Sequence, residues 1–140
     1  MKWYVAARRS EKETVKSLLN ILKEHGHQIT YDWTELEKIK PYKKNIEICK
    51  NIAYDISLAV KDTGVFVLIS GASGTDMFVE LGIAIYTSLN KKKIQIYVVG
   101  NHNKRSLMHL HPSIIHKQTL EEVLMEEGVT IPKGKLKVHE

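Results

Sequence analysis

The sequence predicts a single α/β domain built on an open, mostly parallel sheet of four or five strands flanked by helices. Segments typical of strands and of helices alternate along the chain. The runs VFVLIS (65–70) and IQIYVVG (94–100) carry no charge, as is usual for central parallel strands that helices cover on both faces. The length of 140 residues suits one hydrophobic core, so we assign residues 1–140 to one domain.

The first quarter of the chain predicts a strand, a helix and a second strand. Residues 3–7 (WYVAA) form a short apolar run and predict the first strand. Ser10 and Glu13 have the spacing of a capping box, so we expect a helix to begin there, and Gly26 is placed to end it. Residues 27–33 (HQITYDW) then predict the second strand.

The middle of the chain predicts a long helix, a buried strand and a second helix. Residues 34–45 are rich in charge and are predicted to form a loop with one short turn. Four apolar residues then share one helical stripe, which Gly64 follows: Ile48, Ile52, Ile56 and Val60. After the strand at 65–70, the polar segment 71–76 predicts a loop, and a helix is expected from Met77 to Asn90.

The last third of the chain predicts a strand, a loop and a short helix. Residues 94–100 form the strand, 101–112 a long loop, and 113–117 a weak strand signal. Thr119 and Glu122 form a second capping box, which opens a helix to about Glu127. The tail at 128–140 has two glycines and alternating lysines, and we expect it to be either loose or an edge strand.

The composition excludes several classes of protein. The single cysteine, Cys49, allows neither an intrachain disulfide nor a site with several cysteine ligands. The N-terminus lacks the apolar core of a signal peptide, and no apolar run approaches the roughly 18 residues of a membrane span. The net charge of +5 comes mainly from dispersed lysines and not from a nucleic-acid motif. We therefore expect a cytoplasmic protein that binds neither membranes nor nucleic acids.

A ligand site is expected where the strands end. In open α/β sheets, ligands bind beyond the carboxyl ends of the strands. Three predicted loops lie there, at residues 6–10, 70–76 and 100–112. The middle loop is rich in glycine and precedes a helix, so its N–H groups could face a phosphate, although it matches neither the Walker A nor the GxGxxG pattern. We expect the three loops to converge on one crevice.

Glu80 is a carboxylate inside one of the most apolar stretches of the chain, SGTDMFVELGIAI (73–85). It lies about one turn into the helix that follows the glycine-rich loop, where the helix dipole would also favour a solvated acid. Its neighbours Val79, Leu81 and Ile83 do not supply the polar face that a solvated acid would occupy. A half-buried carboxylate at strand ends suits nucleophilic glycosyl chemistry. The pattern leaves a catalytic and a structural role equally open.

Several segments resemble the nucleoside 2-deoxyribosyltransferase family, which includes the 2′-deoxynucleoside 5′-monophosphate N-glycosidases. They are YVAAR (4–8), YDWT (31–34), AYDI (53–56) with KDTGVFVLIS (61–70), and GTDMFVELGIAI (74–85). The resemblance covers about residues 3–100, and its most specific piece is Glu-Leu-Gly-x-Ala at 80–84. It implies a Rossmann-like (flavodoxin-like) domain that cleaves the N-glycosidic bond of a deoxynucleoside or its monophosphate, without a cofactor or a metal.

The resemblance also implies roles for individual residues. Glu80 would attack the anomeric carbon and form a covalent 2-deoxyribosyl intermediate. Asp55 would protonate the departing base or hold the sugar, and Tyr4 would orient the nucleophile. Three residues at and after the end of the first strand would face the sugar or the phosphate: Ala6, Ala7 and Arg8. The family forms dimers or larger assemblies in which a neighbour's loop closes the site, here around Ser106–His109, so a homodimer is implied.

The sequence departs from the family at the position that separates its branches. The transferases carry an aspartate six residues before the glutamate, and the monophosphate hydrolases carry a serine that contacts phosphate. This chain has Gly74 at that position and Ser73 just before it, which favours a nucleotide substrate and water as acceptor. We expect Asp76 to cap the helix, although a contact with substrate stays open. A transferase that exchanges bases and a non-catalytic nucleotide sensor remain alternatives.

The remaining histidines and aromatic residues predict no separate site. His109 and His111 lack a carboxylate partner at a clear spacing, so we predict an exposed loop and not a metal site. Tyr31 and Trp33 follow the second predicted strand, where packing is favoured over stacking on a base.

Overall fold

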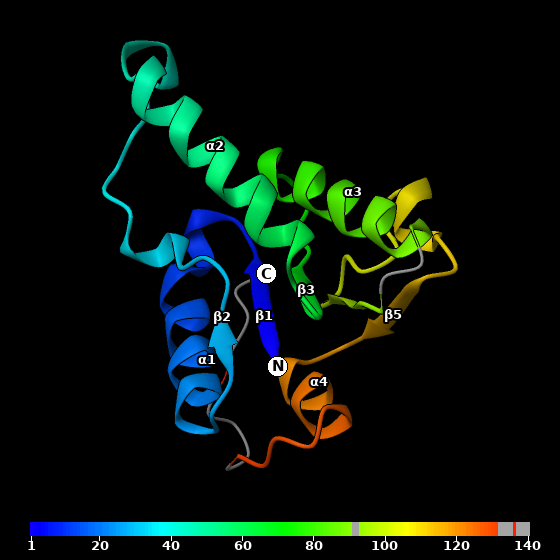
Figure 1. Cartoon of the computed structure of the whole chain (residues 1–140). Coiled ribbons are helices and arrows are strands. Elements are labelled where there is room, and N and C mark those ends of the chain that lie inside the picture. The colour runs from blue at the N-terminus through cyan, green and yellow to red at the C-terminus, as the bar shows by residue number, and fades with distance from the viewer. Residues whose placement is uncertain (91–92, 132–135, 137–140) are drawn as a thin grey trace.

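The computed structural model describes residues 1–90, 93–131 and 136, and these residues contain a parallel sheet of five strands (Figure 1). The strand order is β2-β1-β3-β4-β5, the order of flavodoxin-like doubly wound folds. The fold class predicted from the sequence is therefore confirmed. The strands are β1 (Lys2–Ala6), β2 (Gln28–Ile29), β3 (Val65–Ile69), β4 (Gln95–Val99) and β5 (Ile114–Lys117).

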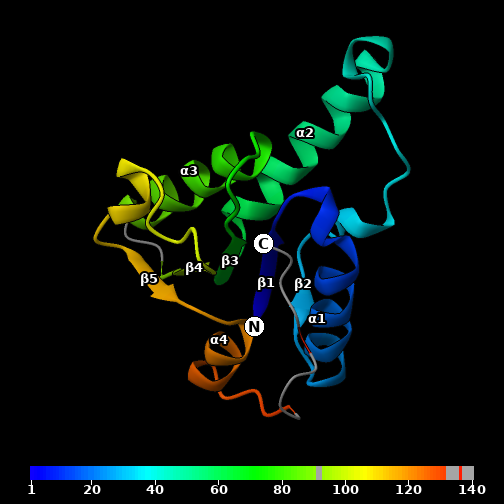
Figure 2. The same ribbon diagram turned by 180° about the vertical axis from the view of Figure 1, so that it is seen from behind.

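Two helices cover each face of the sheet, as Figures 1 and 2 show from opposite sides. One face packs against α1 (Lys12–Glu24) and α4 (Leu120–Glu126), and the other packs against α2 (Ile46–Lys61) and α3 (Asp76–Leu89). The amino-terminal part of α2 projects beyond the rest of the molecule. Short 3-10 turns complete the described elements: η1 (Arg9–Glu11), η2 (Trp33–Glu35), η3 (Tyr42–Lys44) and η4 (Leu107–Leu110).

Strand β3 forms the centre of the core because its neighbours pair with it on both edges and helices cover both of its faces. All five of its residues are buried. Val65, Val67 and Ile69 pack toward α1 and α4, whereas Phe66 and Leu68 pack toward α2 and α3. This alternation follows from the two-residue period of a strand and explains why the run carries no charge.

The predicted helix boundaries are confirmed at some ends and wrong at others. The prediction that a capping box of Ser10 and Glu13 starts the helix is wrong. The Glu11 N–H donates to the Arg8 carbonyl at 2.9 Å, and the chain first forms the turn η1. Helix α1 then begins at Lys12, and Gly26 follows its end with a φ of 83°. The capping box of Thr119 with Glu122 is present at the start of α4.

Strand β2 is much shorter than the sequence predicts. Pairing with β1 ends at Ile29, and the predicted strand is wrong over residues 30–33. Asp32 turns the chain, because its Oδ1 accepts from the Thr34 N–H at 2.9 Å and starts η2. Trp33 then donates from Nε1 to the Val5 carbonyl at 2.7 Å, which fastens this turn to β1.

The predicted tail, 128–140, falls mostly outside the described residues, as do residues 91–92 of the lysine run. Val129 and Leu136 are described, and both pack into the core beside α1 and α4. Over the described ranges, no helix combines the length and the apolar character needed to cross a bilayer.

Candidate active site

The candidate site lies where β1 and β3 end side by side. Ala6 pairs with Leu68 near the ends of these strands, so the segments that follow leave the sheet at the same edge. The next strand along the chain from β1 is β2, on one side, whereas β3 leads to β4 on the other. The order of the sheet therefore reverses between β1 and β3, and such a switch point opens a crevice in doubly wound folds.

Tyr4 and Glu80 meet at this edge. The Tyr4 hydroxyl donates to Glu80 Oε1 at 2.8 Å, which joins β1 to α3. Tyr4 is fully buried and stacks on Phe66 of β3, with ring centroids 5.9 Å apart. This packing fixes the phenol, so the hydrogen bond fixes the orientation of the carboxylate. The structure brings together the proposed nucleophile and the residue expected to orient it.

The environment of Glu80 changes the acidity of its carboxyl group. The pKa of Glu80 is raised from 4.5 to about 7, because burial and, to a smaller extent, the charge of Asp76 raise it more than the Tyr4 hydrogen bond lowers it. Burial and the Glu80 charge also raise the pKa of Tyr4 well above 10, so the phenol stays a hydrogen-bond donor at neutral pH. A carboxyl group with a pKa near 7 can change charge under physiological conditions.

Arg8 and Ser73 form a second pair beside the first. Arg8 Nη1 donates to Ser73 Oγ at 2.9 Å, which joins the segment after β1 to the glycine-rich loop. A Cβ added at Gly71 would lie 2.9 Å from Arg8 Nε, so only glycine lets the guanidinium rest on this loop. Gly74 has a φ of 131°, which also favours glycine. Both glycines thus serve the shape of the loop.

The other predicted residues near the loops lie as follows. Ala6 is fully buried, and Ala7 is partly buried against the core on the α1 side. Asp76 is the first residue of α3 and Thr75 is the N-cap, so the prediction that Asp76 caps the helix is wrong. The Asp76 carboxylate accepts instead from the Tyr42 hydroxyl at 3.4 Å. The turn η3 therefore reaches the start of α3 across 34 residues of sequence.

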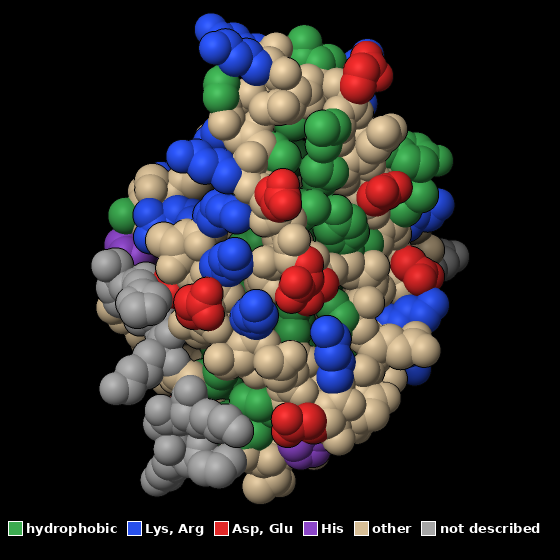
Figure 3. All heavy atoms as spheres, turned by 90° about the vertical axis from the view of Figure 1, so that its left-hand side faces the viewer, with side chains coloured by type: hydrophobic (Ala, Val, Ile, Leu, Met, Phe, Trp, Pro, Cys, Tyr) green, Lys and Arg blue, Asp and Glu red, His purple; other side chains and the backbone are tan. Residues whose placement is uncertain are grey.

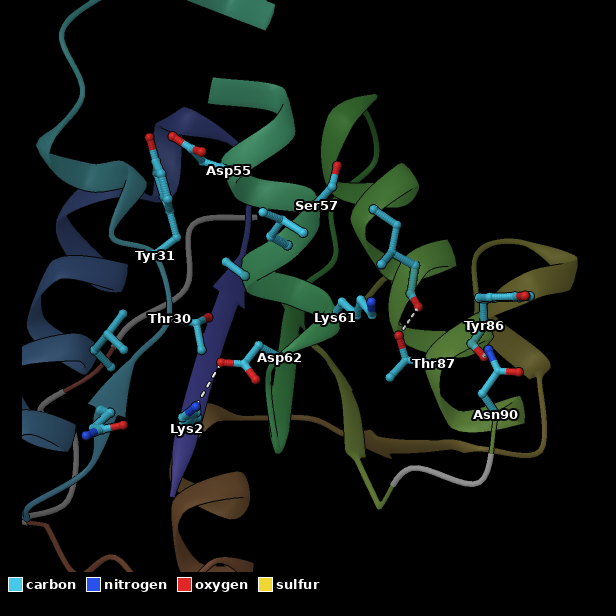
Figure 4. Close-up of a pocket in the computed structure, with 15 residues that line it drawn as sticks. Lys2, Thr30, Tyr31, Asp55, Ser57, Lys61, Asp62, Tyr86, Thr87 and Asn90 are labelled. Atoms are coloured by element: carbon cyan, nitrogen blue, oxygen red, sulfur yellow. Dashed lines mark hydrogen bonds and ion pairs between the residues drawn. The ribbon is translucent and has the colours of Figure 1, made fainter. Parts of the chain in front are cut away.

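Asp55 does not belong to the Tyr4–Glu80 pair. It is exposed on α2 and lines an open groove of about 1250 Å³, together with Tyr31, Leu58 and Tyr86 (Figure 4). Neither Tyr4 nor Glu80 lines this groove. Figure 4 places Asp55 and Tyr31 at one end of it, and burial and the charge of Asp55 raise the pKa of Tyr31. Tyr31 also packs against the buried cluster that contains Tyr4, so this end of the groove adjoins that cluster.

Ser106 and His109 lie differently from what the sequence suggests. His109 is buried at 1% exposure, so the prediction that it belongs to an exposed loop is wrong. Its Nε2 bonds to Ser70 Oγ at 2.9 Å and its Nδ1 to Ser106 Oγ at 2.5 Å. Ser106 thus contacts a residue of its own chain. The spacing of the histidines gives no sign of this network, because Ser70 is 39 residues away.

No group of three or more histidine, cysteine or acidic side chains within the described residues could hold a metal ion. His111 and His116 instead form hydrogen bonds with Ser113 and with the His109 carbonyl.

Comparison with known proteins identifies a fold. No protein-family model matches the chain, and no curated protein matches it significantly. Among solved structures, the chain is similar to a CMP N-glycosidase from Clostridium botulinum, BcmB, with 17% sequence identity and a TM-score of 0.57. The match covers 93% of this chain and 100% of that one. The Rossmann-like fold implied by the sequence is thus confirmed: this chain shares the fold of that N-glycosidase.

Proposed function

We propose that the protein hydrolyses the N-glycosidic bond of 2′-deoxynucleoside 5′-monophosphates, with Glu80 as the nucleophile. The observation that carries the proposal is the Tyr4–Glu80 hydrogen bond of 2.8 Å at the switch point of the sheet. An oriented, partly buried carboxylate at this place suits attack on an anomeric carbon. The shared fold with a CMP N-glycosidase supports a nucleotide as the substrate.

The proposed reaction has two steps at C1′. A Glu80 oxygen bonds to C1′ while the bond from C1′ to the base breaks, and the base leaves with the electron pair. Tyr4 occupies Oε1, so we assign the attack to Oε2. Water then attacks C1′ of the glycosyl ester and gives a proton to the Asp55 carboxylate, which releases the deoxyribose phosphate and restores the Glu80 carboxylate. Because Glu80 must be ionised to attack and its pKa lies at about 7, the rate should rise between pH 6 and pH 8.

Asp55 is proposed to give the departing base its proton. It stands beside Tyr31 at the end of the groove that adjoins the buried cluster of Tyr4. The Asp55→Asn variant should lose about 100- to 10,000-fold in kcat with natural bases, the usual contribution of a general acid. A 4-nitrophenyl leaving group needs no proton, so the same variant should cleave a 4-nitrophenyl 2-deoxyriboside phosphate almost normally. Equal losses on both substrates would remove Asp55 from this role.

Arg8 and Ser73 are proposed to bind the 5′-phosphate. A guanidinium and a hydroxyl 2.9 Å apart, next to a glycine-rich loop, match the donors that a phosphate accepts from. The net charge of +5 also favours an anionic substrate. Arg8→Ala should therefore raise the KM for monophosphates and leave the KM for the matching nucleosides nearly unchanged.

The first experiment is a chromatographic assay of base release. The substrates are deoxynucleosides, their 5′-monophosphates and CMP, each with and without a second free base. The proposal is supported if monophosphates release base, if Glu80→Ala abolishes this release and if Glu47→Gln retains it. Glu47→Gln is the matched control because the Glu47 side chain is 84% exposed on α2. Exchange into a new nucleotide shows a transferase. Binding of nucleotides without release of base shows a non-catalytic sensor and refutes the proposal.

We also propose that the protein is a homodimer that uses the outer faces of α2 and α3. Figure 3 shows hydrophobic side chains grouped over the upper half of one face of the molecule, where α2 projects. Gly82 is exposed within α3, and a Cβ added there would meet nothing within 4 Å, so the helix leaves room for close approach. Large apolar side chains on the two helices are exposed: Ile46, Ile48, Tyr54, Leu58, Val79, Tyr86 and Leu89.

Sedimentation analysis tests the dimer. Leu89 is 64% exposed on α3 and does not line the groove of Asp55, and Met125 is 78% exposed on α4, which covers the opposite face of the sheet. The Leu89→Glu variant should sediment as a monomer, whereas Met125→Glu should remain a dimer. A monomeric wild-type protein, or equal behaviour of the two variants, would contradict this interface.

A further inference from the structure

A buried histidine joins two of the three loops at the candidate site. His109 belongs to the segment after β4, and Ser70 is the first residue after β3. The bond between His109 Nε2 and Ser70 Oγ, 2.9 Å long, lies in the protein interior. A neutral imidazole has one donor and one acceptor, so with Ser106 at Nδ1 both ring nitrogens are used.

His109 is held in place from three other directions. The backbone N–H of His109 donates to the Ser106 carbonyl at 3.1 Å. The backbone carbonyl of His109 lies 2.7 Å from Nε2 of His116 on β5. Its ring lies 5.6 Å from the ring of Phe78 on α3. Burial and the charges of Arg105 and His116 lower the pKa of His109. The imidazole is therefore a rigid, neutral partner for Ser70.

The segment that Ser70 begins carries the proposed phosphate site. Gly71 follows directly, and the Arg8 guanidinium packs on it so closely that a Cβ would lie 2.9 Å from Nε. Arg8 then donates to Ser73 at 2.9 Å. A shift of Ser70 would move the surface that supports Arg8. The described contacts of His109 do not include Tyr4 or Glu80.

We propose that His109 is a positioning residue, which fixes residues 70–73 through its bond to Ser70 and thereby sets the Arg8–Ser73 pair for the phosphate of the substrate. The nature of the ligand rests on the proposed function, whereas the control of the loop does not. Because His109 acts on the binding groups and not on the carboxylate pair, its loss should weaken binding more than bond cleavage.

Amide substitutions separate the two ring nitrogens of His109. Glutamine can place an amide near Nε2 and keep the bond to Ser70, whereas asparagine reaches only the Nδ1 position and loses that bond. His109→Asn and Ser70→Ala should each raise the KM for a nucleoside monophosphate about five- to tenfold and leave kcat within about twofold. The double variant should add nothing further, because both changes remove one bond. His109→Gln should behave like the wild type.

A second measurement needs no activity. Amide hydrogen exchange over residues 70–76 of the free protein should be about five- to tenfold faster in His109→Asn and Ser70→Ala, and unchanged in His109→Gln. If this pattern holds but the wild type releases no base, the proposed function fails and the positioning role stands. The role is overturned if exchange over 70–76 is unchanged, or if His109→Asn and His109→Gln behave alike.

Discussion

The cost of burying Glu80 can be measured as a dependence of protein stability on pH. Folding raises the pKa of this carboxyl group from 4.5 to about 7, so the folded protein retains a proton that the unfolded chain releases between these values. The contribution of Glu80 to stability is therefore fully present below pH 4.5 and is lost as pH rises through 7. The full difference corresponds to about 3 kcal/mol, because one pKa unit is worth about 1.4 kcal/mol.

The Glu80→Gln substitution removes this titration and keeps an oxygen that can accept from the Tyr4 hydroxyl. The free energy of unfolding of Glu80→Gln, minus that of the wild type, should be about 2–3 kcal/mol larger at pH 8 than at pH 5, because only the wild type loses stability as pH rises. Urea unfolding at both pH values, followed by circular dichroism, measures it. The variant Glu47→Gln is the control, because the Glu47 side chain is 84% exposed and forms its ion pair with Lys50 of the same helix. An equal effect of Glu80→Gln at both pH values would refute the burial of a titrating carboxyl group.

Three further predictions follow from single contacts. Tyr4→Phe removes the hydrogen bond that lowers the pKa of Glu80, so the rise in the rate of base release should move to higher pH, which a pH–rate profile detects. Gly71→Ala should push Arg8 away from Ser73 and raise the KM for monophosphates about tenfold, with little change in melting temperature because a flexible side chain can move. Thr119→Ala removes the cap of α4 and should lower the free energy of unfolding by about 1 kcal/mol in urea titrations.

The sequence predicts the layers of this fold well because strand burial and helix periodicity are local patterns. The uncharged run that forms β3 predicts a buried strand without any knowledge of its neighbours. The capping box of Thr119 and Glu122 involves residues only three positions apart, so the sequence alone predicts it. The prediction is wrong where a distant contact decides the local structure. The sequence predicts that Trp33 belongs to the second strand, but Trp33 lies in the turn η2, where its Nε1 donates to the Val5 carbonyl, 28 residues away in sequence.

The same distinction applies to the candidate site. Glu80 stands out in the sequence because its near neighbours are apolar, and the structure explains the charge through the hydroxyl of Tyr4, 76 residues away. His109 has no comparable local signal. A histidine in a polar loop is normally exposed, and only the approach of Ser70 and Phe78 makes this one a buried group with defined partners.

Helix periodicity explains why Asp55 lies apart from Glu80. Ile56 and Val60 lie on the side of α2 that turns toward the sheet, and Asp55 lies about 100° around the helix from Ile56. Residues three and seven positions further share its side, and Leu58 and Asp62 do line the same groove. Asp55 thus faces the groove that Tyr31 also lines, whereas Glu80 does not line it. Under the proposed mechanism, one substrate must reach both carboxylates, so the Asp55→Asn test with two leaving groups decides whether Asp55 takes part at all.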